Sequence, residues 1–414
     1  MSESEPDPAV SARTAPAGFL LGAKVTVAEL ADDPHPVLHG LRDAEPVSWL
    51  PALGGWLVTR ADLADQVLRD PRSFTVDDAR FTTARVVGPS MLSLDGPEHR
   101  RHRDPFARAL RSAPVSTRLA DAAISEAARL VDVLVAGGSP AELRRGLAGP
   151  LAVAVMARML GLGTAPDRLL SWYDAIVAGV SALSAAAADD TDGQAVDGHA
   201  RRVPASAAAA FGELRADIET AVPRDPQSVL ATAAAELSTD ALVSNAAVLL
   251  FGGIETTEGM IGNAIWYLLR DESALARVRA DRGLVKAAVE ESLRLEPAAA
   301  VVDRFAVADF RLGPAEIRRG DLVTVSLAGA GRDPVLFPDP DRYDLDRANV
   351  RQHLAFASGP HYCIGERLAR IEARAAVGAV LDRMPGVRLD PDRPSKPYGL
   401  VFRKPPELPV IWAA

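Results

Sequence analysis

The side chain with the clearest chemical potential in this chain is Cys363, the only cysteine among 414 residues. It lies in the stretch Phe356-Ala-Ser-Gly-Pro-His-Tyr-Cys-Ile-Gly365, directly before a helical pattern that begins at Glu366. The sequence predicts a loop that presents one sulfur near a helix N-terminus, where a thiolate is favoured. Such a thiolate could ligate a porphyrin iron, because glycines let the backbone approach the macrocycle and backbone N–H groups can donate to the sulfur. A lone cysteine in an intracellular protein is more often a small buried hydrophobe, so the residues around Cys363 must decide between that role and iron ligation.

These neighbours match the pattern F-x-x-G-x-H-x-C-x-G, whose fixed positions are Phe356, Gly359, His361, Cys363 and Gly365. The pattern resembles the heme-binding loop of the cytochrome P-450 family, the heme-thiolate monooxygenases. Many members have glycine directly after the phenylalanine, where this chain has Ala357. The resemblance implies that Cys363 is the axial ligand of the iron of heme b (iron protoporphyrin IX). It also implies that Phe356, His361 and Gly365 contact the heme, with His361 donating to a propionate.

A second candidate element is the segment Phe251-Gly-Gly-Ile-Glu-Thr-Thr-Glu258, inside a helix predicted from a cap at Ser238 to about Arg270. Each glycine weakens a helix interior by roughly 1 kcal/mol relative to alanine, which indicates a close approach or a distortion. The segment resembles the oxygen-activation element of the same family. The resemblance implies two catalytic residues: Thr256 hydrogen-bonds dioxygen and Glu255 relays protons. Glu258 could be solvated, bonded to its own helix, or a negative charge near the pocket.

Cations that could hold buried carboxylates form a third group. His99 and Arg103 are four residues apart, in a helix expected to begin near Pro97 with Asp95 as its cap. A pair with this spacing is usually a solvated basic face. In the family the matching pair, together with the arginine matching Arg304, reaches the heme propionates, and carboxylates entering a protein interior need such partners.

Glu291 and Arg294 are three residues apart in a helix predicted over residues 287–294 and can form an ion pair. Most pairs of this kind lie on the surface and contribute little to stability. In the family the pair is buried behind the heme loop and is joined by a second arginine, which Arg347 matches. The resemblance therefore implies a structural role for these three residues.

Four residues are expected to line the substrate pocket by the same resemblance. Gly252 lies in the oxygen-activation element, Trp172 in the first lid helix beside Tyr173, Val301 in a strand that passes the heme edge, and Phe402 in a turn. A loop over residues 185–198 would join two lid helices, which open for substrate entry.

The elements that must position these residues are mostly helical. The pattern predicts a hairpin over residues 47–59, a helix over 61–68, an irregular segment over 74–89, nearly continuous helix over 116–225, and a helix over 368–384. The implied fold is mainly α with small β-sheets, the cytochrome P-450 fold, with heme between the long central helix and the cysteine loop. Residues 1–18 are expected to be disordered and residues 19–414 to form a single heme-thiolate monooxygenase domain.

The bulk composition restricts the partners. The net charge is −9 and no basic block dominates, which argues against non-specific binding of nucleic acid. One cysteine excludes an intrachain disulfide framework and fits a reducing compartment. The acidic N-terminus is not a signal peptide, and no apolar run approaches the roughly 18 residues of a membrane helix. We therefore expect a cytoplasmic monomer of the soluble bacterial type that binds neither nucleic acid nor a membrane.

The implied reaction inserts one oxygen atom from O2 into a small organic substrate, free or bound to a carrier protein, by hydroxylation or epoxidation in secondary metabolism. No G-x-G-x-x-G fingerprint opens a βα unit, so electrons from NAD(P)H must arrive through partner proteins, expected to be a ferredoxin and its reductase. Arg100, Arg108 and Arg111 fall on other faces of the basic segment than His99 and Arg103, and we assign them to docking this donor. Two alternatives stay open: a peroxide-driven heme-thiolate enzyme, and a non-catalytic heme sensor or carrier. The pair Glu255–Thr256 argues against both.

Overall fold

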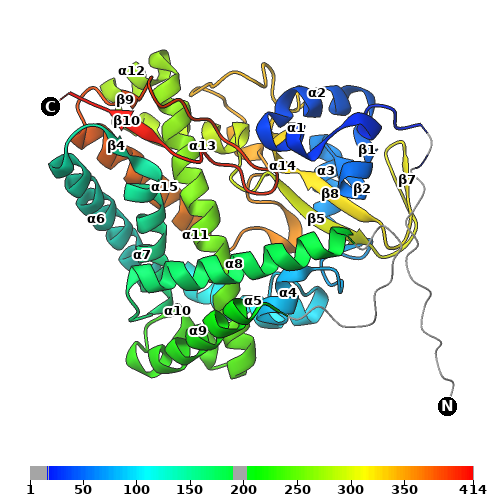
Figure 1. The fold of residues 1–414 in the computed structure, drawn as a ribbon, viewed down its shortest axis with the longest axis horizontal. Coiled ribbons are helices and arrows are strands. Elements are labelled where there is room, and N and C mark those ends of the chain that lie inside the picture. Colours follow the sequence, from blue (N-terminus) through cyan, green and yellow to red (C-terminus); the bar gives the residue numbers. More distant parts are fainter. Residues whose placement is uncertain (1–15, 17, 190–202, 414) are drawn as a thin grey trace.

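One helix of 32 residues, α11 (Thr239–Arg270), runs through the helical part of the molecule (Figure 1). The computed structural model describes residues 16, 18–189 and 203–413. As predicted, the hydroxyl oxygen of Ser238 caps α11 by accepting a hydrogen bond from the Ala241 N–H at 3.3 Å. Most residues of α11 are buried on every side, as expected for a helix at the centre of a large core.

The other helices surround α11 and supply its packing partners. Their bounds in chain order are α1 (Val27–Asp32), α2 (Pro34–Ala44), α3 (Ala61–Arg69), α4 (Thr82–Val87), α5 (Gly96–Arg111), α6 (Ala113–Gly137), α7 (Gly149–Leu160), α8 (Pro166–Asp189), α9 (Ala205–Arg224), α10 (Val229–Ala234), α12 (Glu272–Ala280), α13 (Val285–Leu295), α14 (Leu327–Gly331) and α15 (Glu366–Arg383). A short π-helix, Arg144–Ala148, leads into α7.

Two apolar cores meet along α11. Its N-terminal half, up to Ile254, packs in a core with α5 and α7–α10. Its C-terminal half, from Met260, packs in a core with α6, α12, α13 and α15. The residues between them, 255–259, belong to neither core, and two of them, Thr256 and Thr257, line a cavity between the cores.

Among the described residues, the strands form small sheets in two places: β1, β2, β5, β7 and β8 lie at one side of the molecule, and the sheet β4-β10-β9 lies near the opposite side, beside α12 (Figure 1). A five-stranded sheet has the order β1-β2-β8-β5-β3, in which β2 and β8 are parallel and the other pairs are antiparallel. The strands are β1 (Val47–Leu50), β2 (Gly55–Val58), β3 (Phe74–Thr75), β4 (Ala141–Glu142), β5 (Val301–Ala306), β6 (Phe310–Leu312), β7 (Ala315–Ile317), β8 (Leu322–Ser326), β9 (Arg388–Leu389) and β10 (Pro409–Ile411). The expected mainly α architecture with small sheets is confirmed.

Most predicted elements are found, with two corrections. The segment 74–89, expected to be irregular, contains β3, which pairs with β5, and the helix α4. The helix α8 continues to Asp189, so the first part of the loop predicted over 185–198 is helical. The rest of that loop, and nearly all of the N-terminal segment 1–18, lie outside the described residues. Within the described ranges, we find no helix with the length and hydropathy that a bilayer crossing requires.

Candidate functional site

The loop before α15 holds Cys363 in a fixed position. The Cys363 N–H donates to the carbonyl oxygen of Phe356 at 2.9 Å, and the Gly365 N–H points at the sulfur. Burial raises the pKa of the Cys363 thiol, although the Gly365 N–H and the charge of Arg103 oppose this shift. The sequence predicted a bias toward thiolate. In the protein alone, burial of the sulfur affects the thiol pKa more than the helix N-terminus does. A thiolate at this position therefore depends on a positive charge placed beside it.

Two residues of this loop adopt the left-handed conformation, Ala357 with φ of 57° and Gly359 with φ of 70°. A Cβ at position 359 would lie 2.4 Å from the carbonyl oxygen of Leu68, so only glycine fits there. At position 357 the departure from the family pattern places an alanine where glycine is favoured. The loop therefore carries backbone strain at Ala357 of about 1–2 kcal/mol.

An apolar cavity separates this loop from α11. Its walls include Gly252, Gly253 and Thr256 on one side and Phe356, Cys363 and Gly365 on the other. The remaining wall is largely aliphatic, contributed by Met91, Val248, Leu249, Leu293, Ala298, Ala299, Val302 and Leu368. The structure thus brings the two glycine-containing motifs, more than 100 residues apart in the sequence, to opposite walls of one space.

The two glycines of α11 serve different purposes. A Cβ at Gly253 would lie 2.3 Å from the sulfur of Met156, so this position permits the close approach of α7. A Cβ at Gly252 would meet nothing within 4 Å, since this position borders the cavity. Thr256 also faces the cavity, and its hydroxyl donates to the Gly252 carbonyl oxygen at 2.5 Å. The helix is continuous through this segment, so the glycines mark a close approach and not a break.

The two carboxylates of the motif turn away from the cavity toward cations. Lys404 Nζ lies 2.7 Å from Glu255 Oε1 and also donates to Glu258. Arg144 Nε pairs with Glu258 at 3.0 Å, and the Tyr173 hydroxyl donates to Glu255. Glu258 therefore belongs to an ion-pair cluster and does not put an uncompensated charge in the pocket. Lys404 was not identified from the sequence, because no motif marks it.

Of the four side chains that the resemblance assigned to the propionates, Arg103 and His361 line the cavity and His99 lies beside His361. His99 and Arg103 come from α5, Arg304 from β5, and His361 from the cysteine loop. The His99 ring lies 4.3 Å from the His361 ring, and its buried Nε2 has no partner among the described residues. Burial, reinforced by the charges of His361 and Arg103, lowers the pKa of His99 to about 4. Arg103 donates to the Tyr362 carbonyl oxygen, and the buried Arg304 donates to that of Asp303 at 2.7 Å.

Asp95 occupies the N-cap position of α5, but its carboxylate does not cap the helix. It accepts hydrogen bonds from His361 Nε2 at 2.9 Å, from the Thr75 hydroxyl at 2.6 Å and from the Val76 N–H at 3.0 Å. Burial works against ionisation, yet these hydrogen bonds lower the pKa of Asp95 to about 2. The predicted capping bond is therefore wrong, because tertiary donors compete for the same oxygens.

These residues fit a heme. The unpartnered Nε2 of His99 and the buried guanidinium of Arg304 provide hydrogen-bond donors at one edge, where two propionates would need them. The apolar walls would cover the faces of the macrocycle, and Cys363 would ligate its iron. The individual roles of these side chains stay predictions; Arg103, His361 and Cys363 line the cavity itself.

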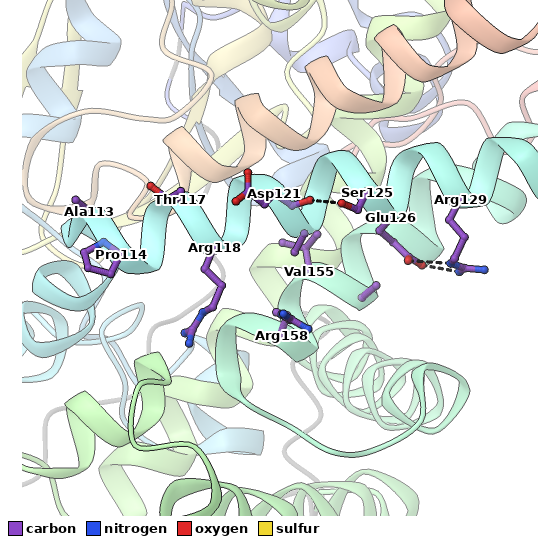
Figure 2. A pocket seen from close by; sticks show the side chains of 12 residues that line it. Ala113, Pro114, Thr117, Arg118, Asp121, Ser125, Glu126, Arg129, Val155 and Arg158 are labelled. Atoms are coloured by element: carbon purple, nitrogen blue, oxygen red, sulfur yellow. Dashed lines mark hydrogen bonds and ion pairs between the residues drawn. The ribbon is translucent and has the colours of Figure 1, made fainter.

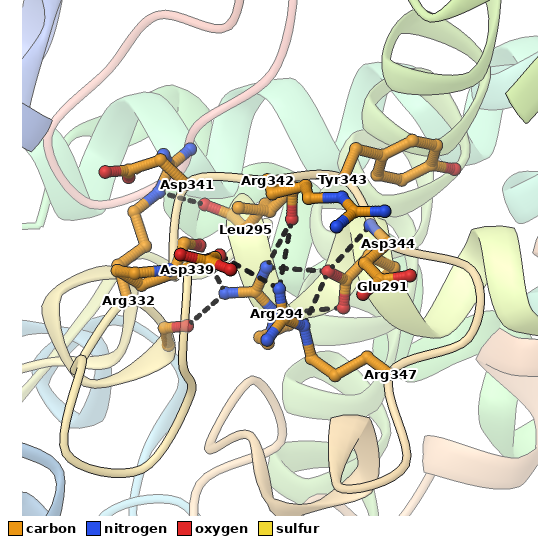
Figure 3. A network of polar contacts seen from close by, with 12 residues as sticks. Glu291, Arg294, Leu295, Arg332, Asp339, Asp341, Arg342, Tyr343, Asp344 and Arg347 are labelled. Atoms are coloured by element: carbon orange, nitrogen blue, oxygen red, sulfur yellow. Dashed lines mark hydrogen bonds and ion pairs between the residues drawn. The ribbon is translucent and has the colours of Figure 1, made fainter. Parts of the chain in front are cut away.

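Behind the loop, Glu291, Arg294 and Arg347 form the network that was expected (Figure 3). Glu291 and Arg294 are fully buried and joined by two hydrogen bonds, of 2.9 and 2.7 Å. Arg347 Nε donates to Glu291 Oε1 at 2.9 Å. Arg294 also donates to three carbonyl oxygens, that of Gly331 at the end of α14 and those of Pro340 and Arg342 in the segment between α14 and the cysteine loop. The network therefore connects α13 to the segment that carries the loop.

The pocket predictions have mixed outcomes. Gly252 borders the cavity. Trp172 packs between α8 and α9 instead, and its indole N–H donates to Glu213 at 2.6 Å. Val301 points into a crevice beside Leu400, and its neighbour Val302 lines the cavity, because successive strand residues face opposite sides. Phe402 packs edge-on against Phe251, at 5.7 Å between ring centres, next to the cavity wall and not on it.

A wide groove elsewhere on the molecule has no part in this site. It lies between α6 and α7 and is lined by arginines and acids, among them Arg118, Arg158 and the exposed pair Arg129–Glu126 (Figure 2). None of the residues that line it belongs to the motifs described above.

Comparisons with known proteins agree with this site. The family model described as cytochrome P-450 matches residues 206–407. Nocardicin C N-oxygenase of Nocardia uniformis subsp. tsuyamanensis is 33% identical over 408 residues, covering 92% of this chain and 96% of that protein. The cytochrome P-450 monooxygenase PikC of Streptomyces venezuelae is 36% identical over 403 residues, covering 93% and 92%. The solved structure of CYP109Q5 from Chondromyces apiculatus superposes with a TM-score of 0.81 at 27% identity, covering 95% of this chain and 99% of that one.

Proposed function

The chain belongs to the cytochrome P-450 family and is a monooxygenase of that family, and from this premise we propose that it inserts one oxygen atom from O2 into an apolar small organic substrate, by hydroxylation or epoxidation. The observation that carries this proposal is the placement of the Thr256 hydroxyl and Gly252 on the cavity wall opposite Cys363. An alcohol at this position, in a helix that leaves open space beside it, suits the binding of a small diatomic molecule.

When bound, heme would supply the redox chemistry that activates O2. Cys363 would hold it from one face, and His99, Arg103, Arg304 and His361 would hold its carboxylates at the edge. Thr256 Oγ1 would accept and pass on a proton on the O2-binding side. Glu255, held between Lys404 and Tyr173, would take up protons from solvent and deliver them toward the neighbouring Thr256.

The lining of the cavity supports an apolar substrate. Aliphatic side chains from α11, β5 and the segment at Met91 form most of the wall. The acids that could have recognised an amine, Glu255 and Glu258, are already paired with Lys404 and Arg144. A substrate would therefore be selected by shape and hydrophobic contact and not by a salt bridge.

Electrons would come from a ferredoxin. A second cleft reaches Cys363 from the outer side of the loop and is lined by Arg103, Arg111 and Arg367, the last two exposed. On a chain with a net charge of −9, this basic surface is suited to attract an acidic donor. Arg108, in contrast, is paired with Glu236 on the surface.

The experiment uses the heme-loaded protein with ferredoxin, reductase and NAD(P)H. A panel of neutral polycyclic, macrolide-like and amine-bearing compounds is first titrated while the main heme absorption band is recorded, and binders are then tested for oxygenated product. Thr256→Ala should lower product and raise hydrogen peroxide, because the proton-passing hydroxyl is gone. Unchanged product yield in Thr256→Ala would refute the role of Thr256. Turnover with peroxide alone would favour the peroxide-driven alternative, and binding without any turnover would favour a sensor or carrier.

A further inference from the structure

Asn245, on α11, is a fully buried asparagine without a role in the function proposed above. Its Oδ1 accepts a hydrogen bond from the Met91 N–H at 2.8 Å. Its Nδ2 donates to the carbonyl oxygen of Ala241 at 2.6 Å and lies 2.9 Å from Nδ1 of the buried His102. One side-chain amide therefore joins α11, α5 and the segment between α4 and α5.

The backbone partners of Asn245 determine which of these groups donate. The Met91 N–H can only donate and the Ala241 carbonyl oxygen can only accept, so Oδ1 faces Met91 and Nδ2 faces Ala241. The second N–H of Nδ2 is then available to His102 Nδ1, which must accept. The proton of His102 is therefore on Nε2, and the ring is neutral. Burial lowers the pKa of His102, which favours the neutral ring.

The segment held by this amide is the turn Ser90–Ser93. The Ser90 N–H donates to Ser93 Oγ at 3.1 Å, and the Ser93 N–H donates to the Ser90 carbonyl oxygen at 3.1 Å. The Leu92 N–H donates to Ser90 Oγ at 3.3 Å. These three bonds close the turn on itself, whereas the Met91 N–H connects it to Asn245 on α11.

The turn places two side chains on the cavity wall, those of Met91 and Leu92. The chain before it already runs close to α11, since a Cβ at Gly88 would lie 2.9 Å from the Ser244 hydroxyl oxygen. Met91 is buried, and its unbranched thioether side chain adapts to its surroundings. The place of this side chain on the wall therefore depends on where the backbone of the turn is held.

We propose that Asn245 and His102 are positioning residues for substrate selection, which hold the turn Ser90–Ser93 against α11. They thereby fix the part of the wall that Met91 and Leu92 present to an apolar substrate. If the turn moved away, the buried Asn245 amide and the Met91 N–H would each lose a partner, which is costly for buried groups. His102 accepts from the same amide on the side of α5 and so restricts it to one orientation. The inference rests on the monooxygenase function proposed above.

The test titrates the heme-loaded protein with two iron-binding probes, imidazole and 4-phenylimidazole, and records the main heme absorption band without an electron donor. Both probes ligate the iron through a ring nitrogen, but the phenyl ring of the second extends further into the cavity. Asn245→Leu and Met91→Ala should each weaken the binding of 4-phenylimidazole about fivefold, because apolar contact with the wall is lost. The affinity for imidazole should change by less than about twofold.

A double-mutant cycle separates positioning from a general loss of stability. The variant that combines Asn245→Leu with Met91→Ala should bind 4-phenylimidazole about as weakly as either single variant, because both changes act through the same side chain. His102→Gln offers an amide oxygen that can accept from Asn245, so it should retain more affinity than His102→Leu. If Asn245→Leu does not retain heme, His102→Leu takes its place in the cycle.

Asn263→Leu is the matched control. Asn263 is also buried on α11, but its Nδ2 donates to the carbonyl oxygens of Glu296 and Arg403, both at 3.0 Å. This variant should lower the unfolding midpoint and leave the ratio of the two probe affinities within about twofold of the wild type.

The proposal is overturned if Asn245→Leu leaves the ratio of the two probe affinities unchanged, or if Asn263→Leu lowers that ratio equally. Full additivity of Asn245→Leu and Met91→Ala also overturns it. If the wild type forms no product, the function proposed above fails, and the titrations still decide whether Asn245 positions the turn.

Discussion

Arg294 is the residue whose loss should destabilise this protein most. Its guanidinium is fully buried and makes two hydrogen bonds to Glu291 and three to backbone carbonyl oxygens (Figure 3). Arg294→Ala would leave the fully buried carboxylate of Glu291 with Arg347 and the Asp344 N–H as its remaining partners. Breaking a buried pair in this way costs about 3–5 kcal/mol, before any cost of the unpaired carbonyl groups.

This loss can be converted into a temperature. An unfolding entropy of about 2.1 cal/mol/K per residue gives roughly 0.9 kcal/mol/K for a chain of this length. A loss of about 4 kcal/mol therefore lowers the unfolding midpoint by about 4–5 °C. The assay is thermal unfolding of the heme-loaded protein by circular dichroism, at one fixed scan rate, together with the heme content per chain from its absorption.

Arg277→Ala is the matched control, because Arg277 forms an exposed ion pair with Asp346. Surface pairs contribute about 0.2–1 kcal/mol, so the control should shift the midpoint by about 1 °C or less. Arg294→Lys keeps the charge but loses the planar fork and should fall between the two. If Arg294→Ala retains its heme and unfolds within about 1 °C of the wild type, the reasoning from burial is refuted.

Three other predictions concern the loop, the ion-pair cluster and the acid response. Ala357→Gly should raise the unfolding midpoint and Gly359→Ala should lower it along with heme content. Ala357→Gly removes the backbone strain of a left-handed alanine, about 1–2 kcal/mol, whereas Gly359→Ala forces a Cβ to 2.4 Å from a backbone oxygen. Shifts of the midpoint in the same direction for both variants would contradict this account. Lys404→Met should lower the free energy of unfolding by about 2 kcal/mol or more, because two partly buried carboxylates lose a shared cation. Lys396→Met, at an exposed ion pair, should change the free energy of unfolding little. Equal urea midpoints for the two variants would disprove this difference. Glu290 is buried, and although burial opposes ionisation, His353 and Arg370 lower its pKa to about 2. A lowered carboxyl pKa stabilises the fold above the unfolded pKa of about 4.3, and the effect disappears as the pH falls toward 2. Glu290→Gln should therefore lose roughly 3 kcal/mol at pH 7 in urea unfolding and approach the wild type near pH 2; a pH-independent difference would refute this.

Local patterns in the sequence were sufficient to predict a structural feature wherever the contacts that determine it lie close together along the chain. The cap at Ser238, the boundaries of α11, the hairpin β1–β2 and the turn geometry around Cys363 depend on hydrogen bonds and dihedral preferences within a few residues. The pairing of Glu291 with Arg294 has the same origin, since residues three apart on a helix are neighbours. The motifs that identified the family likewise lie within short stretches of the sequence.

Side-chain partners that come from distant segments could not be predicted in this way. Asp95 has the sequence position of a helix cap, but it bonds to His361, 266 residues away. The family resemblance assigned Trp172 to the pocket, but its indole N–H donates to Glu213 on α9.

The same limit applies to the acids of the site. The spacing of Glu258 left open that its charge lies in the pocket, and only the positions of Lys404 and Arg144 show that it is paired. The sequence alone determined the family and most of the elements, because those depend on motifs and geometry within short stretches of chain. The tertiary structure decided which charges are paired and which side chains line the cavity, because those depend on the distances between segments far apart in the chain.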